Sequence, residues 1–395
     1  MPRYYVTASH LDAVRADVLA RHRRLRGDRV RFLLVSPDRD PRDLLALSST
    51  DLAGADDPGH RVGVERLWRA CAAAGDLRRA GEGWYFRLSR YGGRLRELVA
   101  GGGLRVEPVG SRDAVLALLG AGVVDVRADG PAGTGVPVPD DPGRVMAPWW
   151  DAAVGLTGLG NGPNPRRWWL EGDRRVHVVG ADDLHRHALL WPAVLLSAGL
   201  PPPTDVCAHP TGPDLARQAR RHGADAVRWW LLRDGTADDR VARLAAAELS
   251  GVLGDLVDRT TTMVHRYRGG RPPAAGLLPG ADALLAACRD APGRVDDALA
   301  AFDFRAATDA VWRVVVTARR YADQARPWDL ARAERAGDRD AGERLDAVLA
   351  ALLTACRALA TELTPFLPTL AAGIAGQCIT LTESLAAPRA LFPRR

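Results

Sequence analysis

The sequence predicts an α/β fold in which a doubly wound parallel sheet is split by an inserted subdomain and followed by a C-terminal helical bundle. Three observations lead to this prediction. The chain opens with an apolar strand, a helix and a second strand. A similar strand–helix–strand series returns near residue 176, and the signals after Asp234 are almost purely helical. Strand–helix–strand units of this length imply parallel pairing with a right-handed crossover.

The first strand–helix–strand unit lies within residues 4–36. The apolar run YYVT (residues 4–7) predicts a strand, and a helix follows from Leu11, with apolar residues near helical spacing until Gly27 ends it. The run RVRFLLVS (residues 29–36) predicts the second strand, and the turn PDRDP follows it. Together these segments form the first half of the predicted sheet.

The second half of the sheet is predicted after an irregular, Gly- and Pro-rich stretch. A strand at residues 176–180 leads into a helix over about 183–197, and another strand is expected over Asp205–His209. Long amphipathic segments after residue 234, separated by Gly/Pro loops, predict a helical bundle. We therefore expect five parts: residues 1–48 and 146–233 as the two halves of the sheet domain, 49–145 as the insertion, 234–385 as the helical domain and 386–395 as a tail.

The composition limits the compartment and the classes of partner. All 54 basic residues are arginine, since the sequence contains no lysine, and the formal net charge is +6. This balance permits a polyanionic partner without requiring one. The five cysteines form no CxxC pair, which argues for a reducing cytoplasm and against a bound metal. We find no signal peptide and no apolar run long enough to span a bilayer, so we expect a cytoplasmic protein that does not enter membranes.

A series of strings occurs along the chain in a fixed order. The strings are YYVT with ADVLARHRRLRGDRVRFL, GWYFRLSRYGGRLRELV, GVPVP with PWWDAAVG, VHVVGADDLHRHALLWPAVLLSAGLP, RHGADAVRWWLLRD, GVLGDLVDRT and ARPWDLA. In this order they resemble the methionyl-tRNA synthetase family of class I aminoacyl-tRNA synthetases. The resemblance covers nearly the whole chain, and its collinearity is more specific than any single string. It implies a Rossmann-like class I synthetase core, a reduced connecting insertion and an anticodon-binding-like bundle.

The chain departs from that family where the family handles phosphate. The HIGH signature is reduced to His10-Leu11 within VTASHLD, so His10 is the one candidate catalytic remnant. The segment PTGPDLARQAR fills the place of the lysine-containing KMSKS loop, and Ala181 takes the place of the lysine in the family's Gly-Lys-Asp. The zinc knuckle of the family's insertion is absent from the sequence as well. No cofactor follows from the residues themselves, and ATP is the one that the resemblance allows.

The resemblance implies a second group of residues, which contact ligands. Asp38 matches the acid that holds the substrate amino group, while Trp149 and His187 match the walls of the methionine pocket. Gly180 and Asp182 match nucleotide-binding positions that face a ribose. Ala153 and Leu156 depart from the family's pocket, so the match does not extend to methionine itself.

In the bundle, Arg259 and Trp328 match residues that stack on and bond anticodon bases. Asp255 stands where the family has an asparagine, which places a negative charge at a base edge. The implied partners are thus an amino acid or aminoacyl-type small molecule, and tRNA.

The same residues also have ordinary structural interpretations. Trp149 and Trp328 suit packing anchors, and His187 suits a hydrogen-bonded core histidine. Asp182 suits a helix cap and Asp38 a turn. Arg259 suits a solvated helix face, and His10 suits a loop.

Three functions therefore stay open at this stage. The first is a binding module built on a synthetase scaffold, for an amino acid, an aminoacyl group or tRNA. The second is a re-purposed enzyme that activates or couples amino acids in specialised metabolism. The third is a still active methionine–tRNA ligase, which the missing signatures disfavour.

Overall fold

The computed structural model describes residues 1–9, 12–35, 42–53, 58–133, 135–150, 168–210, 215–233, 240–274, 280–380 and 383–392. The chain divides into two compact units. The sheet unit comprises residues 1–43 and 47–214, and the helical unit comprises residues 44–46 and 215–395.

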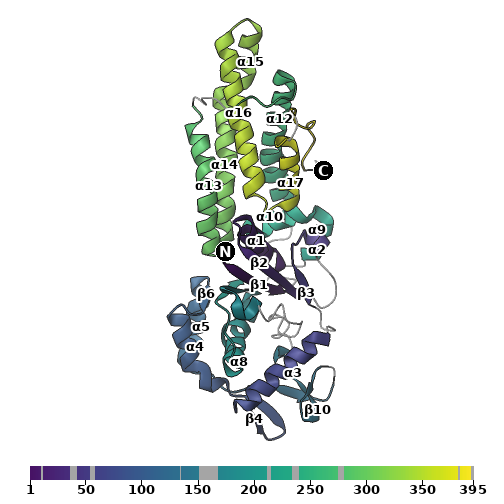
Figure 1. Cartoon of the computed structure of the whole chain (residues 1–395), viewed down its shortest axis with the longest axis vertical. Helices are drawn as coiled ribbons and strands as arrows, with labels where there is room; N and C mark the ends of the chain where they lie inside the picture. The colour runs from purple at the N-terminus through teal and green to yellow at the C-terminus, as the bar shows by residue number, and fades with distance from the viewer. Residues whose placement is uncertain are drawn as a thin grey trace. The chain divides into compact units, whose positions relative to one another are not determined.

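A six-stranded sheet forms the centre of the sheet unit, in the order β3-β2-β1-β11-β12-β6 (Figure 1). Every neighbouring pair in this sheet is parallel. The strands are β1 (Arg3–Ser9), β2 (Arg29–Val35), β3 (Asp51–Ala53), β6 (Arg105–Glu107), β11 (Arg174–Gly180) and β12 (Asp205–His209). The centres of β1, β11 and β12 read as continuous buried runs, as expected for strands covered on both faces. The predicted α/β fold, with its parallel sheet and C-terminal helices, is confirmed.

The remaining elements of the sheet unit cover this sheet or extend from it. Two three-stranded sheets have the orders β8-β10-β9 and β4-β5-β7. Their strands are β4 (Leu77–Ala80), β5 (Gly83–Phe86), β7 (Val126–Arg127), β8 (Asp129–Pro131), β9 (Pro137–Val138) and β10 (Asp141–Met146). The helices are α1 (Ala13–Leu25), α3 (Pro58–Ala73), η1 (Leu88–Tyr91), α4 (Gly92–Ala100), α5 (Val109–Ala121), η2 (Ala181–Asp183), η3 (Arg186–Leu190) and α8 (Trp191–Ser197). The short α2 (Arg42–Leu45) is divided between the units, because residues up to Asp43 belong to the sheet unit and residues 44–46 to the helical unit.

The helix predicted over residues 183–197 is present, but its hydrogen-bonding pattern changes along its length. A 3₁₀ turn, η2, is followed by one π-helical stretch, η3, and only then by α8. Pro192 lies in the first turn of α8. Proline lacks an N–H and its ring crowds the carbonyl four residues earlier, so the wider π turn before it relieves the clash. His187 lies in this π-helical turn.

The helical unit consists of ten helices among the described residues. They are α9 (Leu215–His222), α10 (Ala224–Arg233), α11 (Arg240–Leu244), η4 (Ala245–Gly254), α12 (Asp255–Arg268), α13 (Asp282–Ala300), α14 (Phe304–Ala325), α15 (Pro327–Arg335), α16 (Arg339–Glu362) and α17 (Pro368–Cys378). Helices α13, α14 and α16 run side by side, and α12 and α17 pack along α16 (Figure 1). None of the helices in the described ranges is long and apolar enough to cross a membrane.

Two features of this division differ from the boundaries expected from the sequence. Strands β3 and β6 lie within the expected insertion, yet they form both edges of the main sheet. Helices α9 and α10 belong to the helical unit rather than to the sheet domain. Arg228 of α10 explains the second difference, because its buried guanidinium donates to the carbonyl oxygens of Pro365 and Phe366 at 2.8 and 2.7 Å.

Candidate functional site

Polar side chains lie at the carboxyl ends of the central strands. We call this end of the main sheet the sheet edge, as distinct from its outer strands β3 and β6. β1, β11 and β12 are parallel neighbours, so Ser9, Gly180 and His209 end their strands at the same edge. The order of the strands reverses between β1 and β11, since β2 and β3 extend from β1 while β12 and β6 extend from β11. Open α/β sheets bind their ligands at such a reversal.

A buried polar cluster follows the ends of β1 and β12. Asp12 accepts a hydrogen bond from the Ser9 hydroxyl at 2.6 Å, and its other carboxylate oxygen lies 2.9 Å from Nε2 of His209. Arg15, one turn further along α1, places a guanidinium nitrogen 3.0 Å from Nδ1 of His209. Nδ1 of His209 also lies 2.9 Å from the carbonyl oxygen of Pro210. Nδ1 must accept from Arg15 but donate to Pro210, so the two contacts favour opposite tautomers of one imidazole.

A pair of histidines lies near this polar cluster, on β11 and η3. Nδ1 of His177 on β11 and Nδ1 of His187 on η3 are 3.0 Å apart, so one ring donates and the other accepts. The His177 ring packs edge-on against Trp169 at 5.7 Å between ring centroids, and Trp169 packs against Tyr5 at 5.8 Å. His187 therefore contacts His177, whose ring packs in turn against Trp169 and Tyr5.

Burial decides the charge of this histidine pair. It lowers the pKa of His187 to about 4, an effect partly opposed by the carboxylates of Asp183 and Asp12. It also lowers the pKa of His177 well below the ordinary histidine value, and the neighbouring His187 adds to the shift. Both rings are neutral near pH 7, so they supply no positive charge for a phosphate at this end of the sheet.

The structure describes four of the six residues predicted for this edge. Gly180 is the buried last residue of β11, and Asp182 is exposed in the turn that follows. Trp149 is half-buried, and its indole N–H donates to the carbonyl oxygen of Arg127 at 2.9 Å. His187 lies in the histidine pair. His10 and Asp38, like Ala153 and Leu156, fall outside the described residues.

The three residues predicted for the bundle line a single pocket. Asp255 and Arg259 of α12 and Trp328 of α15 border a cavity of about 270 Å³, together with Tyr267 of α12 and Arg319 of α14. Trp328 is 40% exposed. An exposed indole beside donor and acceptor groups suits a flat heteroaromatic ring, such as a nucleobase.

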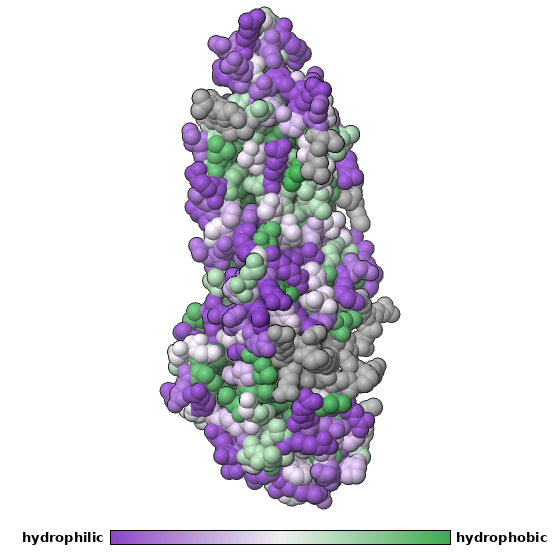
Figure 2. All heavy atoms as spheres, in the orientation of Figure 1, coloured by the Kyte–Doolittle hydropathy of each residue, from purple (hydrophilic) through white to green (hydrophobic). Residues whose placement is uncertain are grey.

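Local backbone geometry explains why Trp328 is exposed. Arg326 adopts a left-handed conformation with φ of 47°, which ends α14, and Pro327 then starts α15. The side chain of Arg326 donates to Asp329 at 2.6 Å and holds the turn. Hydrophilic residues cover the tip of the bundle around α15 (Figure 2).

Asp255 is engaged with its neighbour in this pocket. Nε of Arg259 donates to the Asp255 carboxylate at 3.0 Å, one helical turn away. The arginine side chain is 63% exposed and the aspartate 22%. The ion pair gives the rim of the pocket a net charge near zero at this point, while Arg319 and Asp323 add a second arginine and a second carboxylate.

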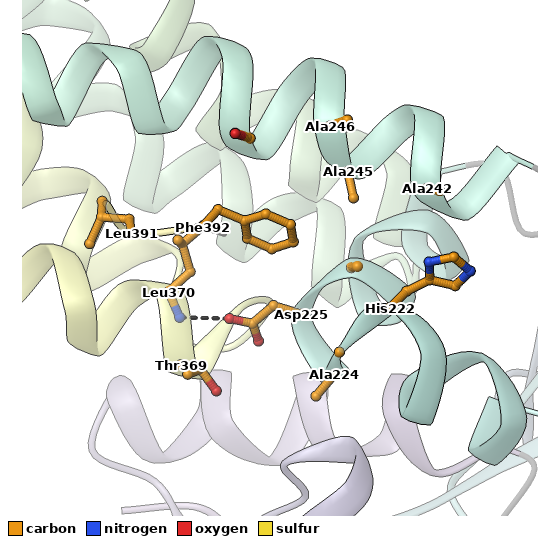
Figure 3. Close-up of a pocket in the computed structure, with 13 residues that line it drawn as sticks. His222, Ala224, Asp225, Ala242, Ala245, Ala246, Thr369, Leu370, Leu391 and Phe392 are labelled. Carbon is orange, nitrogen blue, oxygen red and sulfur yellow. Dashed lines mark hydrogen bonds between the residues drawn. The ribbon is translucent and has the colours of Figure 1, made fainter. Parts of the chain in front are cut away.

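A larger cavity of about 720 Å³ lies elsewhere in the helical unit, and none of the predicted site residues lines it. Figure 3 shows Asp225 accepting a hydrogen bond from the backbone N–H of Leu370, at 2.6 Å, while the ring of Phe392 lies beside it. Asp225 thus caps the N-terminus of α17 from another helix. The rest of the lining is largely alanine and other apolar side chains, which argues for packing rather than chemistry.

Four residues of the sheet edge were not predicted from the sequence: Asp12, Arg15, His177 and His209. The histidines stand within or at the end of apolar strands, where they read as core. No group of three or more side chains suited to a metal ion occurs among the described residues.

Comparisons with known proteins agree with this arrangement. The family model described as tRNA synthetases class I (M) matches residues 69–211. A methionine–tRNA ligase of Streptomyces coelicolor is 31% identical over 73% of this chain and 57% of the relative. One from Caldanaerobacter subterraneus is 29% identical over 73% of this chain and 48% of the relative. The chain spans about half the length of the curated relatives it matches.

Solved structures give the same fold. The Mycobacterium tuberculosis methionyl-tRNA synthetase in complex with methionyl-adenylate superposes with a TM-score of 0.90 and 24% identity, over 100% of both chains. The fold and the matched segment are those of the class I aminoacyl-tRNA synthetases. Within that class, the curated relatives that match the chain are methionine–tRNA ligases, so the chain resembles the methionyl-tRNA synthetase family.

Proposed function

We propose that this chain is a synthetase-like binding protein that keeps a tRNA-binding site in its helical unit and has lost ordinary methionylation. The observation that carries the proposal is the pocket in which Asp255, Arg259 and Trp328 meet. These residues were matched to base-contacting positions one by one from the sequence, and they come from two different helices. Their meeting in a pocket about the size of a base supports a retained RNA contact.

The loss of methionylation rests on the chemistry that the sequence lacks. Activation of an amino acid builds negative charge on a phosphate, and positioned cations and N–H donors stabilise most of it. The chain has no lysine at all, and only His10-Leu11 remains of the first signature. The neutral His177–His187 pair adds no cation at the sheet edge. A still active methionine–tRNA ligase would need other arginines to take over this work.

A second candidate function is the binding or coupling of an amino-acid-derived small molecule at the sheet edge. The polar cluster of Asp12, Arg15 and His209 favours it, since it lies where the strand order reverses. A carboxylate and a guanidinium side by side suit the amino and carboxylate groups of an amino acid. Such a site would serve a re-purposed enzyme as well as a binding module.

Two measurements separate these functions. The first is ATP–pyrophosphate exchange with each amino acid, with and without tRNA, beside an Asp182→Ala control. We expect no exchange; exchange that Asp182→Ala abolishes would restore an adenylating enzyme. The second is the affinity for unfractionated tRNA.

Trp328→Ala should weaken tRNA binding by about 5- to 150-fold, because stacking on one base contributes about 1–3 kcal/mol. Trp328→Phe keeps a ring and should retain most of the affinity. Arg259→Ala should weaken binding, whereas Arg266→Ala is the matched control, since Arg266 is exposed on the same helix and does not line the pocket. Equal affinities for all four variants would contradict a base contact here.

A further inference from the structure

A third hollow of the helical unit lies between α13 and α14 and is rich in arginine. Its volume is about 510 Å³, and its charged lining residues are Asp290, Arg294, Arg313 and Arg320. The two helices are antiparallel neighbours joined by a short turn at residues 301–303. We call this hollow the α13–α14 groove.

The groove exists because one wall is made of small side chains. Ala283, Ala286 and Ala287 of α13 face the longer side chains of α14 across it. On α14, the positions 313, 317, 320 and 324 repeat at helical spacing, so Arg313, Thr317, Arg320 and Gln324 form one polar stripe along the groove. Val316 lies beside this stripe and is 53% exposed.

The three arginines of the groove are available to a ligand. Arg294, Arg313 and Arg320 are exposed, and none lies within ion-pairing distance of a carboxylate among the described residues. Many other arginines of this protein are paired, as Arg268 is with Glu334 and Asp346. With Asp290 as the one acid in the lining, the groove carries a formal charge of three positive and one negative side chains.

A buried hydroxyl adds a further unused group. Tyr321 lines the groove and is 7% exposed, and its hydroxyl has no hydrogen-bond partner among the described residues. A buried polar group without a partner costs free energy, which an acceptor from a ligand would recover. Phosphate oxygens are such acceptors.

The spacing of the charges favours a chain of phosphates over a single one. Arg313 and Arg320 are seven residues apart on a helix, which separates their Cα atoms by about 10 Å. That span is too long for one phosphate group to bridge, so the two guanidiniums can each contact a different phosphate of one strand. A site for one small phosphate would instead gather its guanidiniums around a point.

The groove also adjoins the pocket that holds Trp328. Arg319 of α14 lines that pocket, and the next residue, Arg320, lines the groove. Two successive residues of one helix therefore serve the two hollows. A strand whose base enters the pocket can pass over α14 and place its next phosphates in the groove.

We infer that the α13–α14 groove binds the phosphate backbone of an RNA whose base occupies the Trp328 pocket. The inference rests on the proposed tRNA-binding function. It adds a site that contacts the phosphate charges of the RNA and does not distinguish its bases. Phosphate contacts position a nucleic acid and make its affinity depend on salt. Base contacts at Trp328 depend on salt far less.

The test is the salt dependence of tRNA affinity, measured with unfractionated tRNA between 50 and 300 mM salt. Each lost phosphate contact should reduce the slope of log affinity against log salt by roughly 0.7–0.9. Arg313→Ala/Arg320→Ala should therefore flatten the slope by roughly 1.5 and weaken binding at low salt by tenfold or more. Arg289→Ala is the matched control, because Arg289 is exposed on α13 outside the groove.

The outcomes separate the two proposals. A flatter slope in the groove variant, with the slope of Arg289→Ala unchanged, supports the groove. Equal slopes in wild type and both variants overturn the groove and leave the Trp328 pocket in place if Trp328→Ala still weakens binding. A wild-type protein that binds no tRNA overturns the proposed function and the groove together.

Discussion

In the sheet unit, Asp12, His209, His177 and His187 touch other polar side chains and are almost fully buried. In the helical unit, Arg259 and Trp328 face solvent, and the ion pair with Asp255 is the main tie between the pocket's polar groups. The sheet edge is thus a fixed network in which each group orients the next. The bundle pocket is an open receptor whose groups are placed by helix geometry alone. A buried network should respond to pH and couple to stability, whereas an open pocket should respond to ligand and salt.

The largest expected effect is a loss of stability on acidification that originates in the sheet unit. The pKa of His187 is about 4 in the folded chain and about 6.5 when unfolded, so the unfolded chain binds more protons between these values. The free energy of unfolding is unaffected by His187 above pH 6.5. It falls as the pH drops from 6.5 toward 4, and at pH 4 the loss from this one group is about 3 kcal/mol.

Urea unfolding followed by tryptophan fluorescence between pH 7 and 4 measures this loss. His187→Gln removes the titrating group, so its free energy of unfolding should depend less steeply on pH. Identical slopes for the wild type and this variant would mean that His187 is not held neutral in the folded state.

A smaller effect is expected from the buried acid of the helical unit, which we assign to structure. Asp225→Ala leaves the N–H of Leu370 without its carboxylate partner and should lower the free energy of unfolding by about 1–3 kcal/mol. Well below the melting temperature, tRNA affinity should match that of the wild type, because Asp225 does not line the Trp328 pocket. A changed tRNA affinity in the folded variant would mean that the large cavity is part of the binding site.

The smallest effect on stability is expected at the open pocket itself. Asp255→Asn breaks an exposed ion pair one helical turn long, which contributes roughly 0.3–0.5 kcal/mol. The same change removes a negative charge beside the RNA and frees Arg259, so tRNA affinity should rise a few-fold. Thermal unfolding and a tRNA titration measure the two quantities on one sample. A fall in affinity would show that the carboxylate itself contacts the ligand.

The sequence predicted the central strands well, because buried apolar runs bounded by Gly and Pro leave few alternatives. β12 was predicted with its observed bounds, and β1 and β2 to within two residues. The edge strands β3 and β6 were missed because they are three residues long and lie in an irregular region. The π-helical turn before Pro192 also has no periodic signal of its own.

The candidate sites were predictable to different degrees for the same physical reasons. Arg259 and Trp328 were predicted from the family resemblance, and the structure shows that both line one pocket. The contact of Asp12 with His209 depends on β1 and β12 flanking β11, an order that no local pattern encodes. His177 looked like any inward residue of a strand until its partner on η3 was known.

The pairing of β1 with β11 cannot form until β11 has been synthesised. β2 can join β1 as soon as the first segments leave the ribosome, but the other edge of β1 waits for residues 174–180. At ordinary rates of synthesis that wait is on the order of ten seconds. During it the nascent chain carries an apolar strand with one unpaired edge, which invites pairing with other chains. The long insertion between the two halves of the sheet therefore makes timing, as well as sequence, a condition for correct folding.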